Sequence, residues 1–279
     1  MVRTGLFLEG EVLDLTDPAV GLPPDMTVLL EGGVDALDRA RSAPAGPARR
    51  LPLEGLRLAA PVPRPPKVLA IALNYRDHIA ELGGREAPEF PTFFNKQRTC
   101  VVGPTDAVEL PRVSAQLDYE GELALVIGRR CRHVSAAEAP SVVAGFTVLN
   151  DLSVRDWQWR TPTMTIGKSF DTHGPMGPVL VTPDEIGDPH RLGIRTLVNG
   201  ELRQEGTTGD MVFDGWAQIE HLTTAFTLEP GDVVSTGTPA GVGASFTPPR
   251  WLRAGDVVRV EIEGIGVLEN PVVDEPAYQ

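Results

Sequence analysis

Eight short apolar segments, rich in β-branched residues and separated by turns that contain glycine or proline, run through this chain of 279 residues. Segments of this length, bounded by turn residues, are typical of buried strands. Between them, the stretch 214–228 has apolar residues at helical spacing. The segments do not alternate regularly with helices, which favours an α+β fold with a mixed, curled sheet over a doubly wound parallel sheet. The expected strands are residues 68–73, 120–128, 142–149, 179–181, 194–198, 233–236, 257–262 and 267–273.

A proline cluster divides the chain. Residues 61–66 read Pro-Val-Pro-Arg-Pro-Pro, which can continue neither a helix nor a sheet ladder. We therefore predict a small N-terminal α/β module over 1–64 and a catalytic domain over 65–279. Within the module, the pattern predicts a hairpin over 1–15 and a helix over 26–41. The expected inner face of that helix consists of Val28, Leu29, Val34 and Leu37.

The charge of the chain argues against several classes of partner. Acidic residues outnumber basic ones 38 to 25, which gives a formal net charge of -13 at pH 7. A protein this acidic repels phosphate backbones and anionic lipid, so we expect neither nucleic acid nor a membrane as a partner. The two cysteines, Cys100 and Cys131, are too few for a disulfide framework, and we expect both to be buried as small apolar side chains. These features predict a cytoplasmic protein.

Three carboxylates have the spacing of a metal site. Glu120 and Glu122 lie two residues apart in an expected strand, so their side chains share one face. Asp151 follows the next expected strand directly. Carboxylates this close repel one another unless a proton or cation lies between them, and oxygen ligands suit Mg²⁺ or Mn²⁺, with Ca²⁺ as a further candidate. Taken alone, a Glu-x-Glu pair is more often two solvated acids on an edge strand.

A histidine and a glutamate follow the expected strand 68–73. His78 and Glu81 are three residues apart, which places them on one face of a helix. A carboxylate one turn from a histidine fixes its tautomer and raises its basicity, as a water-activating base requires. An exposed helix position explains His78 equally well from spacing alone. The polar, glycine-rich residues 83–89 that follow are suited to a lid that excludes water.

Further polar residues occur near the expected strand ends. Arg155 and Gln158 lie about one helical turn beyond Asp151, and Lys168 lies in a loop flanked by glycine. Residues 235–243 run from a strand into a turn of small residues, which can approach a ligand through its backbone. This turn is not a phosphate-binding Walker A loop, because no Gly-Lys-Ser/Thr closes it.

Taken together, these motifs resemble the fumarylacetoacetate hydrolase family over roughly residues 65–275. The resemblance implies a β-roll-like α+β catalytic domain and a homodimer. It implies that Glu120, Glu122 and Asp151 bind the metal and that His78 and Glu81 form a water-activating pair. It assigns the substrate-contacting roles to Tyr75, Arg155, Gln158, Lys168 and Thr238. The matching blocks, in the family's order, are 73–75 with 78 and 81, 119–123, 150–155, 167–171 and 235–239.

The function that this resemblance implies is metal-dependent cleavage of a carbon–carbon bond in a 2,4-dioxo acid such as an acylpyruvate. His78, oriented by Glu81, would deprotonate the attacking water, and the products would be pyruvate and a carboxylic acid. The same residues would also serve oxaloacetate decarboxylation, hydration of a 2-oxo-alkenoate or keto–enol tautomerisation. A non-catalytic binding or scaffold protein is the alternative from another class, although a scaffold has no need of adjacent, mutually repelling acids.

Overall fold

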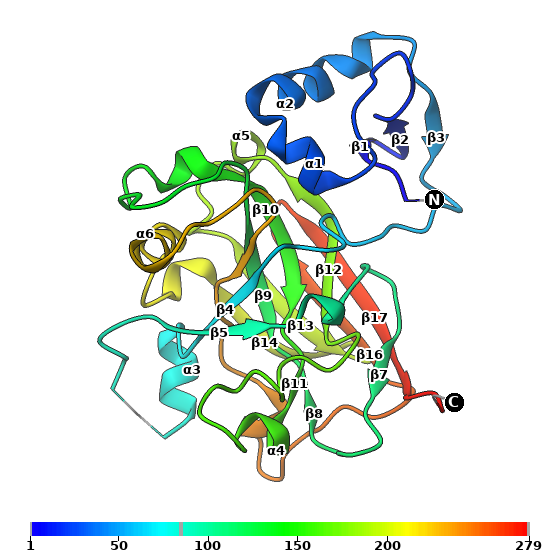
Figure 1. Cartoon of the computed structure of the whole chain (residues 1–279). Coiled ribbons are helices and arrows are strands. Elements are labelled where there is room, and N and C mark those ends of the chain that lie inside the picture. The colour runs from blue at the N-terminus through cyan, green and yellow to red at the C-terminus, as the bar shows by residue number, and fades with distance from the viewer. Residues whose placement is uncertain (1, 84–85, 278–279) are drawn as a thin grey trace.

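Two β-sheets form the catalytic domain in the computed structural model, which describes residues 2–83 and 86–277 (Figure 1). The seven-stranded sheet has the order β5-β4-β15-β9-β10-β12-β6, and the five-stranded sheet has the order β14-β13-β16-β17-β7. The first consists of β4 (Val68–Ala72), β5 (Thr92–Lys96), β6 (Val101–Val102), β9 (Gly121–Ile127), β10 (Val143–Asn150), β12 (Gly174–Val181) and β15 (Val233–Ser235). The second consists of β7 (Val108–Leu110), β13 (Gly193–Val198), β14 (Glu201–Thr207), β16 (Val257–Ile262) and β17 (Gly266–Asp274).

The sheets are mixed and curled, as the sequence predicts. Strand β15 pairs in parallel with β4 and antiparallel with β9, so both pairing modes meet at the centre of the larger sheet. Each of the eight predicted strands is present, with ends shifted by a few residues. A separate two-stranded ladder joins β8 (Leu117–Asp118) to β11 (Ser153–Val154). The α+β fold class is thus confirmed.

Strand β9 is buried along its whole length, because both of its faces are covered. Leu123, Leu125 and Ile127 point into the main core of the catalytic domain. Ala124 and Val126 alternate with them and point to the opposite face, into a smaller apolar cluster. By the same alternation, the side chain of Glu122 points to the same face of β9 as Ala124 and Val126. A carboxylate therefore lies at the end of this apolar face.

The N-terminal module contains the predicted hairpin, formed by β1 (Gly5–Leu8) and β2 (Glu11–Asp14) and joined by β3 (Arg50–Pro52). The single helix predicted over 26–41 is wrong, because two helices, α1 (Met26–Glu31) and α2 (Gly33–Ser42), meet at Gly32. Gly33 has a φ of +60°, which turns the chain between the helices. The turn changes the buried face, so Val28 and Val34 are 51% and 70% exposed. Leu29 is buried and Leu37 is partly buried, as predicted, and the further buried residues are Leu30, Ala36 and Ala40.

The module packs on the larger sheet of the catalytic domain (Figure 1). Leu30 of α1 and Val62 of the proline-rich segment share an apolar cluster with Ala124, Val126 and Val233. The module therefore covers the face of β9 and β15 that the main core does not cover. The division at residues 64 and 65 stays a prediction.

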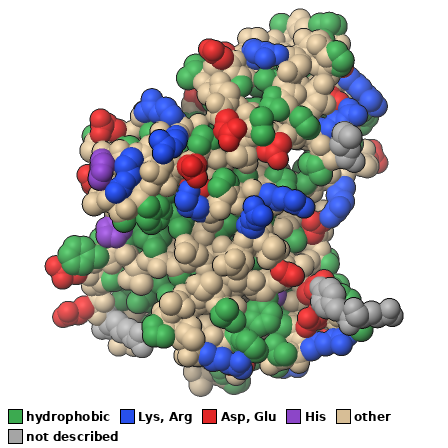
Figure 2. Space-filling model, in the orientation of Figure 1, with side chains coloured by type: hydrophobic (Ala, Val, Ile, Leu, Met, Phe, Trp, Pro, Cys, Tyr) green, Lys and Arg blue, Asp and Glu red, His purple; other side chains and the backbone are tan. Residues whose placement is uncertain are grey.

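The remaining α-helices are few and short. They are α3 (Arg76–Glu81), α4 (Arg155–Gln158), α5 (Pro183–Ile186) and α6 (Gly215–Ala225). The side chain of Asp214 accepts a hydrogen bond from the Ala217 N–H and begins α6, in agreement with the predicted helix over 214–228 apart from its last turn. None of the helices in the described ranges has the length and apolar character needed to span a membrane. Figure 2 shows acidic and basic side chains interspersed over one face of the molecule.

Candidate active site

The three predicted metal ligands meet where β9 begins and β10 ends. The two strands pair antiparallel, with Leu149 opposite Glu122, so the residue that follows β10 lies beside the residue that precedes β9. The Asp151 N–H donates to the Glu120 carbonyl at 2.8 Å. One carboxylate oxygen from each of Glu120, Glu122 and Asp151 lies within 4.8 Å of the others, and all three side chains are buried. The structure therefore brings together the acids that the sequence singles out.

The environment of Glu122 fits a bound cation. Its Oε2 accepts hydrogen bonds from Ser235 Oγ at 2.5 Å and from the Gly237 N–H at 2.9 Å. Its Oε1 is buried and has no hydrogen-bond partner in the part of the chain that the structure describes. Burial, reinforced by the charges of Asp151 and Glu120, raises the pKa of Glu122 well above its usual value. A hard divalent cation would accept this free oxygen and relieve the repulsion, so the donor set suits Mg²⁺, Mn²⁺ or Ca²⁺.

Two predicted cations face the carboxylates directly. Lys168 Nζ lies 2.7 Å from Glu120 Oε2 and 2.8 Å from Asp151 Oδ2, and Arg155 Nη1 lies 2.6 Å from Glu120 Oε1. Burial alone would raise the pKa of Glu120, but Lys168 and Arg155 lower it to about 2. Burial would likewise lower the pKa of Lys168, but Asp151 and Glu120 raise it above its usual value. Lys168 is therefore an ammonium that donates to both carboxylates.

Sequence reasoning missed Lys96 and Asp118, which complete the charge network. Lys96 Nζ lies 2.7 Å from Asp151 Oδ1 and donates to the carbonyls of Leu152 and Lys168. Asp118 Oδ2 accepts from Arg155 Nε at 2.8 Å. Lys96 ends a strand in which Phe94 and Lys96 share the buried face. A lysine at such a position requires a buried partner, and this requirement was the signal that could have revealed it.

Arg155 connects the network to Gln158. Its Nη1 donates to Gln158 Oε1 at 2.9 Å along α4. Its Nη2 is buried and has no hydrogen-bond partner among the described residues. A substrate carboxylate can therefore accept a hydrogen bond from this nitrogen, as the family resemblance implies.

His78 and Glu81 form the expected pair on α3. His78 Nδ1 lies 2.6 Å from Glu81 Oε1, and the second oxygen of Glu81 accepts from the Gly241 N–H at 2.9 Å. Burial alone would raise the pKa of Glu81, but the hydrogen bonds from His78 and Gly241 lower it. The ionised carboxylate holds the proton on Nδ1 and leaves Nε2 free to accept one. His78 is only 8% exposed, so the alternative of an exposed helix position does not apply.

Tyr75 and Thr238, which the family resemblance assigns to substrate binding, have different surroundings. Tyr75 is fully buried, and its hydroxyl has no hydrogen-bond partner within residues 2–83 and 86–277. Burial and the nearby charge of Glu122 raise the pKa of Tyr75, so this phenol stays protonated and available to the site. The Thr238 hydroxyl instead donates to the Gly121 carbonyl and accepts from Gln204 Nε2, both within the protein. The predicted lid over 83–89 includes residues 84 and 85, which lie outside the described residues.

The assembled groups can hold a dication and move protons beside it. Four buried carboxylates face three buried cations, so with every group ionised the cluster carries one net negative charge, which a divalent cation would reverse. The reversed charge would suit an anionic oxo acid, and the imidazole of His78 lies near Glu120. The resulting chemistry is proton transfer at a carbon or water next to a polarised carbonyl.

Comparisons with known proteins agree with this arrangement. The chain is 44% identical over 275 residues to the mitochondrial oxaloacetate tautomerase fahd2 of Xenopus laevis, covering 97% of this chain and 86% of that protein. The fumarylacetoacetate hydrolase of the psychrophile Exiguobacterium antarcticum superposes with a TM-score of 0.85 at 39% identity, covering 98% and 95% of the two chains. The maleylpyruvate hydrolase of Sphingobium sp. SYK-6, solved with manganese(II) and pyruvate, superposes with a TM-score of 0.81 at 32% identity, covering 98% and 97%.

A family-wide match gives the same result. The family described as "Fumarylacetoacetate (FAA) hydrolase C-terminal" matches residues 67–273, which include every residue of the candidate site. Matches of this extent and identity leave one assignment: the chain belongs to the fumarylacetoacetate hydrolase family.

Proposed function

We propose that this protein is a divalent-metal-dependent tautomerase that interconverts the keto and enol forms of oxaloacetate or a similar 2-oxo dicarboxylic acid. The observation that carries the proposal is the buried His78–Glu81 pair beside the carboxylates of Glu120, Glu122 and Asp151. The 44% identity to a protein named as an oxaloacetate tautomerase supports this reaction over the carbon–carbon hydrolysis expected from the sequence. We also propose that the protein acts as a homodimer, as the resemblance implies.

Glu120, Glu122 and Asp151 would hold the cation, since they supply three buried oxygen donors and one of these oxygens has no other partner. A bound dication would polarise the 2-oxo group and make the neighbouring C3 protons more acidic. Mg²⁺ and Mn²⁺ both suit these ligands.

The protein's own groups supply the proton transfers. His78 Nε2 accepts a proton from C3 of the keto acid, and the electron pair of the broken C–H bond forms the C2–C3 double bond. The 2-oxo oxygen then takes a proton from the third N–H of Lys168, because Glu120 and Asp151 accept the other two. The net reaction moves one proton from carbon to oxygen; His78 then releases its extra proton to solvent, and Lys168 takes one back.

Arg155 and Tyr75 orient the substrate. The free Nη2 of Arg155 donates to a carboxylate, while Gln158 and Asp118 hold the guanidinium in place. The Tyr75 hydroxyl, buried beside Glu122, provides a further donor. These fixed donors discriminate for a dianionic acid because an unmatched buried donor costs binding energy.

Hydrolysis of a 2,4-dioxo acid is the second candidate. The solved relative that contains manganese(II) and pyruvate is a maleylpyruvate hydrolase, and its chain aligns along 98% of this one. In that reaction His78 Nε2 would take the proton from water instead of carbon. Water would then add to the distal carbonyl, and cleavage of the carbon–carbon bond would release pyruvate and a carboxylic acid.

A parallel assay separates the candidates. The Mg²⁺- or Mn²⁺-loaded protein is given oxaloacetate, acetylpyruvate and fumarylpyruvate, while ultraviolet absorbance follows the enol and a coupled assay follows pyruvate. We expect accelerated enol–keto conversion of oxaloacetate without pyruvate, and loss of this acceleration in His78→Asn. Pyruvate from an acylpyruvate would favour the hydrolase, and pyruvate from oxaloacetate would favour a decarboxylase. No turnover, together with a melting temperature unchanged by metal and oxalate, would leave the scaffold alternative.

A further inference from the structure

A turn of small residues, 237–244, follows β15 and donates main-chain N–H groups to acids of the candidate site. The Gly237 N–H donates to Glu122 at 2.9 Å, and the Gly241 N–H donates to Glu81 at the same distance. Successive N–H groups in a turn can form a concave surface that binds anions, and here the anions are the protein's own carboxylates. One turn therefore orients both a proposed metal ligand and the partner of the proposed base.

Asp118 is a further acid that this turn holds. Its Oδ1 accepts from the Gly243 N–H at 2.6 Å and from the Tyr119 N–H at 2.9 Å. Its Oδ2 accepts from the Ala244 N–H at 2.9 Å and from Arg155 Nε at 2.8 Å. The side chain is fully buried, and each oxygen already accepts two hydrogen bonds. Asp118 therefore has no free acceptor position for a metal ion, and its contacts join the turn to Arg155.

The orientation of Arg155 depends on this contact. Strands β8 and β11 pair with Asp118 opposite Ser153, which brings the start of α4 beside Asp118. Arg155 donates from Nε to Asp118 and from Nη1 to Gln158 at 2.9 Å. A guanidinium group is planar, so two fixed nitrogens also fix the direction of the third. This third nitrogen, Nη2, is the buried one that lacks a hydrogen-bond partner among the described residues.

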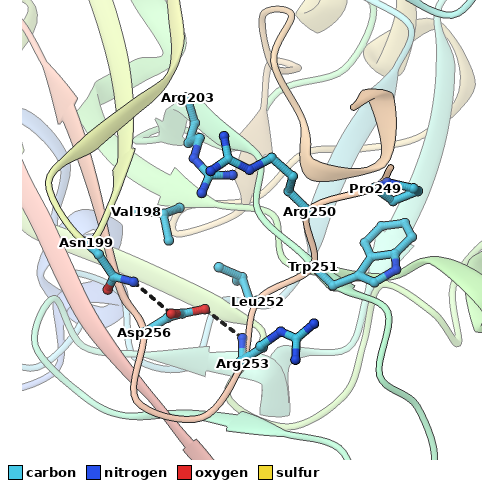
Figure 3. Close-up of a pocket in the computed structure, with 9 residues that line it drawn as sticks. All are labelled: Val198, Asn199, Arg203, Pro249, Arg250, Trp251, Leu252, Arg253 and Asp256. Atoms are coloured by element: carbon cyan, nitrogen blue, oxygen red, sulfur yellow. Dashed lines mark hydrogen bonds between the residues drawn. The ribbon is translucent and has the colours of Figure 1, made fainter. Parts of the chain in front are cut away.

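The turn itself has little room to move. The segment 249–253 contacts it, and the Arg250 N–H donates to the Gly243 carbonyl at 2.9 Å. Figure 3 shows this segment in the wall of a cavity of about 300 Å³. A Cβ on Gly243 would lie 2.5 Å from the Arg250 carbonyl oxygen and 2.6 Å from Asp118 Oδ1. The turn therefore contacts Asp118 closely and is held in that position by a second segment.

We propose that Asp118 is a positioning residue, which directs the free Nη2 of Arg155 toward a substrate carboxylate. It does so from the same turn that holds Glu81 and thereby orients His78. The carboxylate-binding nitrogen and the proton-accepting nitrogen therefore keep a fixed separation before substrate arrives, which lowers the entropic cost of binding. This role rests on the proposed function, although its binding step needs only an anionic ligand.

Asp118→Asn weakens the anchor with little change in shape. In either orientation its amide NH₂ faces two N–H donors, so half of the anchoring hydrogen bonds are lost. We expect the KM for oxaloacetate to rise about tenfold, as the loss of one charge-assisted hydrogen bond predicts. The kcat should change less than about threefold, because Arg155 binds the substrate and the transition state equally. Isothermal titration calorimetry of the Mg²⁺-loaded protein with oxalate should show a similar, about tenfold, loss of affinity.

Asp106→Asn is the matched control. Asp106 accepts from Arg57 Nε at 3.0 Å and from the Gly103 N–H at 2.8 Å, so it also joins an arginine to a backbone N–H. It contacts none of the proposed substrate-binding residues in the described part of the chain. The variant should therefore keep the wild-type KM, kcat and oxalate affinity.

Gly243→Ala tests the same link from the turn, and it carries the test if Asp118→Asn does not fold. The added methyl group pushes the turn away from Asp118, so KM should rise. The kcat should fall as well, because the same turn holds Glu81. Gly193→Ala is the control, since a Cβ there meets nothing closer than 3.6 Å.

The outcomes separate this role from the proposed reaction. Unchanged KM and oxalate affinity in Asp118→Asn, a fall in kcat alone, or an equal effect of Asp106→Asn would overturn the positioning role. A wild-type protein that binds no oxalate would overturn it too. A wild-type protein that binds oxalate without converting oxaloacetate would refute only the tautomerase, and the oxalate affinities of the variants would then decide the role of Asp118.

Discussion

Lys96 neutralises Asp151 from a position that no water reaches. Its side chain is fully buried, and its ammonium faces one carboxylate oxygen and two carbonyls. Removing a single partner from such a pair leaves an uncompensated buried charge, which costs far more than the pair itself contributes. Lys96 therefore determines both the stability of the site and the orientation of one proposed metal ligand.

We predict that Lys96→Met lowers the free energy of unfolding of the metal-free protein by about 3–5 kcal/mol. Urea titration in EDTA measures the change, and added Mg²⁺ should restore part of it by neutralising Asp151. The control is Arg41→Met, which breaks exposed ion pairs with Asp38 and Asp184 and should cost less than about 1 kcal/mol. Similar losses of unfolding free energy in both variants would show that burial does not make the Lys96–Asp151 pair more important for stability than an exposed pair.

Glu81 fixes the proton of His78 on Nδ1. In Glu81→Gln the amide NH₂ donates to Nδ1, which moves the imidazole proton to Nε2 and blocks the base. We expect the kcat of oxaloacetate tautomerisation to fall about 10- to 100-fold, with KM changed less than about threefold, as for loss of an orienting partner. Glu185→Gln, on the exposed surface, serves as the matched control. A normal kcat in Glu81→Gln would exclude the orienting role.

Glu122 gives the metal-free protein a defined dependence on pH. Its folded-state pKa is raised above the usual 4.5 by burial and by Asp151 and Glu120, so the folded state retains its proton longer than the unfolded state. Its contribution to stability is therefore lost as the pH rises above 4.5 through the raised pKa. We predict that Glu122→Gln, which cannot ionise, becomes progressively more stable than the wild type across this window in EDTA.

Urea unfolding at intervals from pH 5 to pH 8 measures the effect. Saturating Mg²⁺ should remove the decline in the wild type, because the cation takes the place of the proton, and should not stabilise Glu122→Gln. Parallel stability curves for the two metal-free proteins would contradict the assignment of the raised pKa to Glu122.

At the scale of elements, the turn after β15 connects the site to the second sheet. Gly241 has a φ of +102°, its N–H caps Glu81, and its Cα faces the Arg203 carbonyl. Gly255, in the turn before β16, has a similar φ of +95° but nothing within 4 Å of the position of a Cβ. Substituting each glycine in turn therefore distinguishes the cost of a positive φ from the cost of a steric clash.

We predict that Gly255→Ala costs about 1–2 kcal/mol of unfolding free energy, the strain of a positive φ alone. Gly241→Ala should cost more and should lower kcat, because the turn must move and weaken its hydrogen bond to Glu81. Urea unfolding and the tautomerase assay measure both quantities. Equal losses of stability with unchanged kcat would show that the contact with Arg203 does not hold the turn.

The elements differ in how far their sequences predict them. Strands such as β9 and β10 are buried on both faces, so their sequences are continuous apolar runs that identify them. Strand β14 lies at a sheet edge and reads Glu-Leu-Arg-Gln-Glu-Gly-Thr, so its pairing with β13 leaves little trace in hydrophobicity. The turn at Gly33 that divides α1 from α2 was hidden by a helical pattern on both sides.

The same contrast holds for the site. The carboxylates at 120, 122 and 151 were predictable because they lie in or directly beside two apolar strands, at a spacing that suits a metal site. Lys96 and Asp118 were not predicted, since their partners lie 55 and 37 residues away along the chain and only strand pairing brings them together. Thr238 was assigned to the substrate from its motif, whereas its hydroxyl is engaged by Gly121 and Gln204.

For the whole molecule, the N-terminal module and the catalytic domain share an apolar cluster. Leu30 is 1% exposed and packs with Ala124, Val126 and Val233. We predict that Leu30→Ala lowers the free energy of unfolding by about 2–5 kcal/mol and shifts a single calorimetric transition as a whole. Val34→Ala, at a position that is 70% exposed, should change the free energy of unfolding by less than about 0.5 kcal/mol. A second, unshifted transition in Leu30→Ala would show that the two parts unfold separately.

The anchoring of Glu122 also determines when the site can form during synthesis. Its partners Ser235 and Gly237 follow it by 113 and 115 residues, and Glu81 waits even longer for Gly241. A ribosome-bound chain that has exposed β9 and β10 already displays all three acids, yet it lacks the two groups that anchor Glu122. The anchor of Glu122 is therefore completed only after the last third of the chain has emerged, well after the three acids themselves.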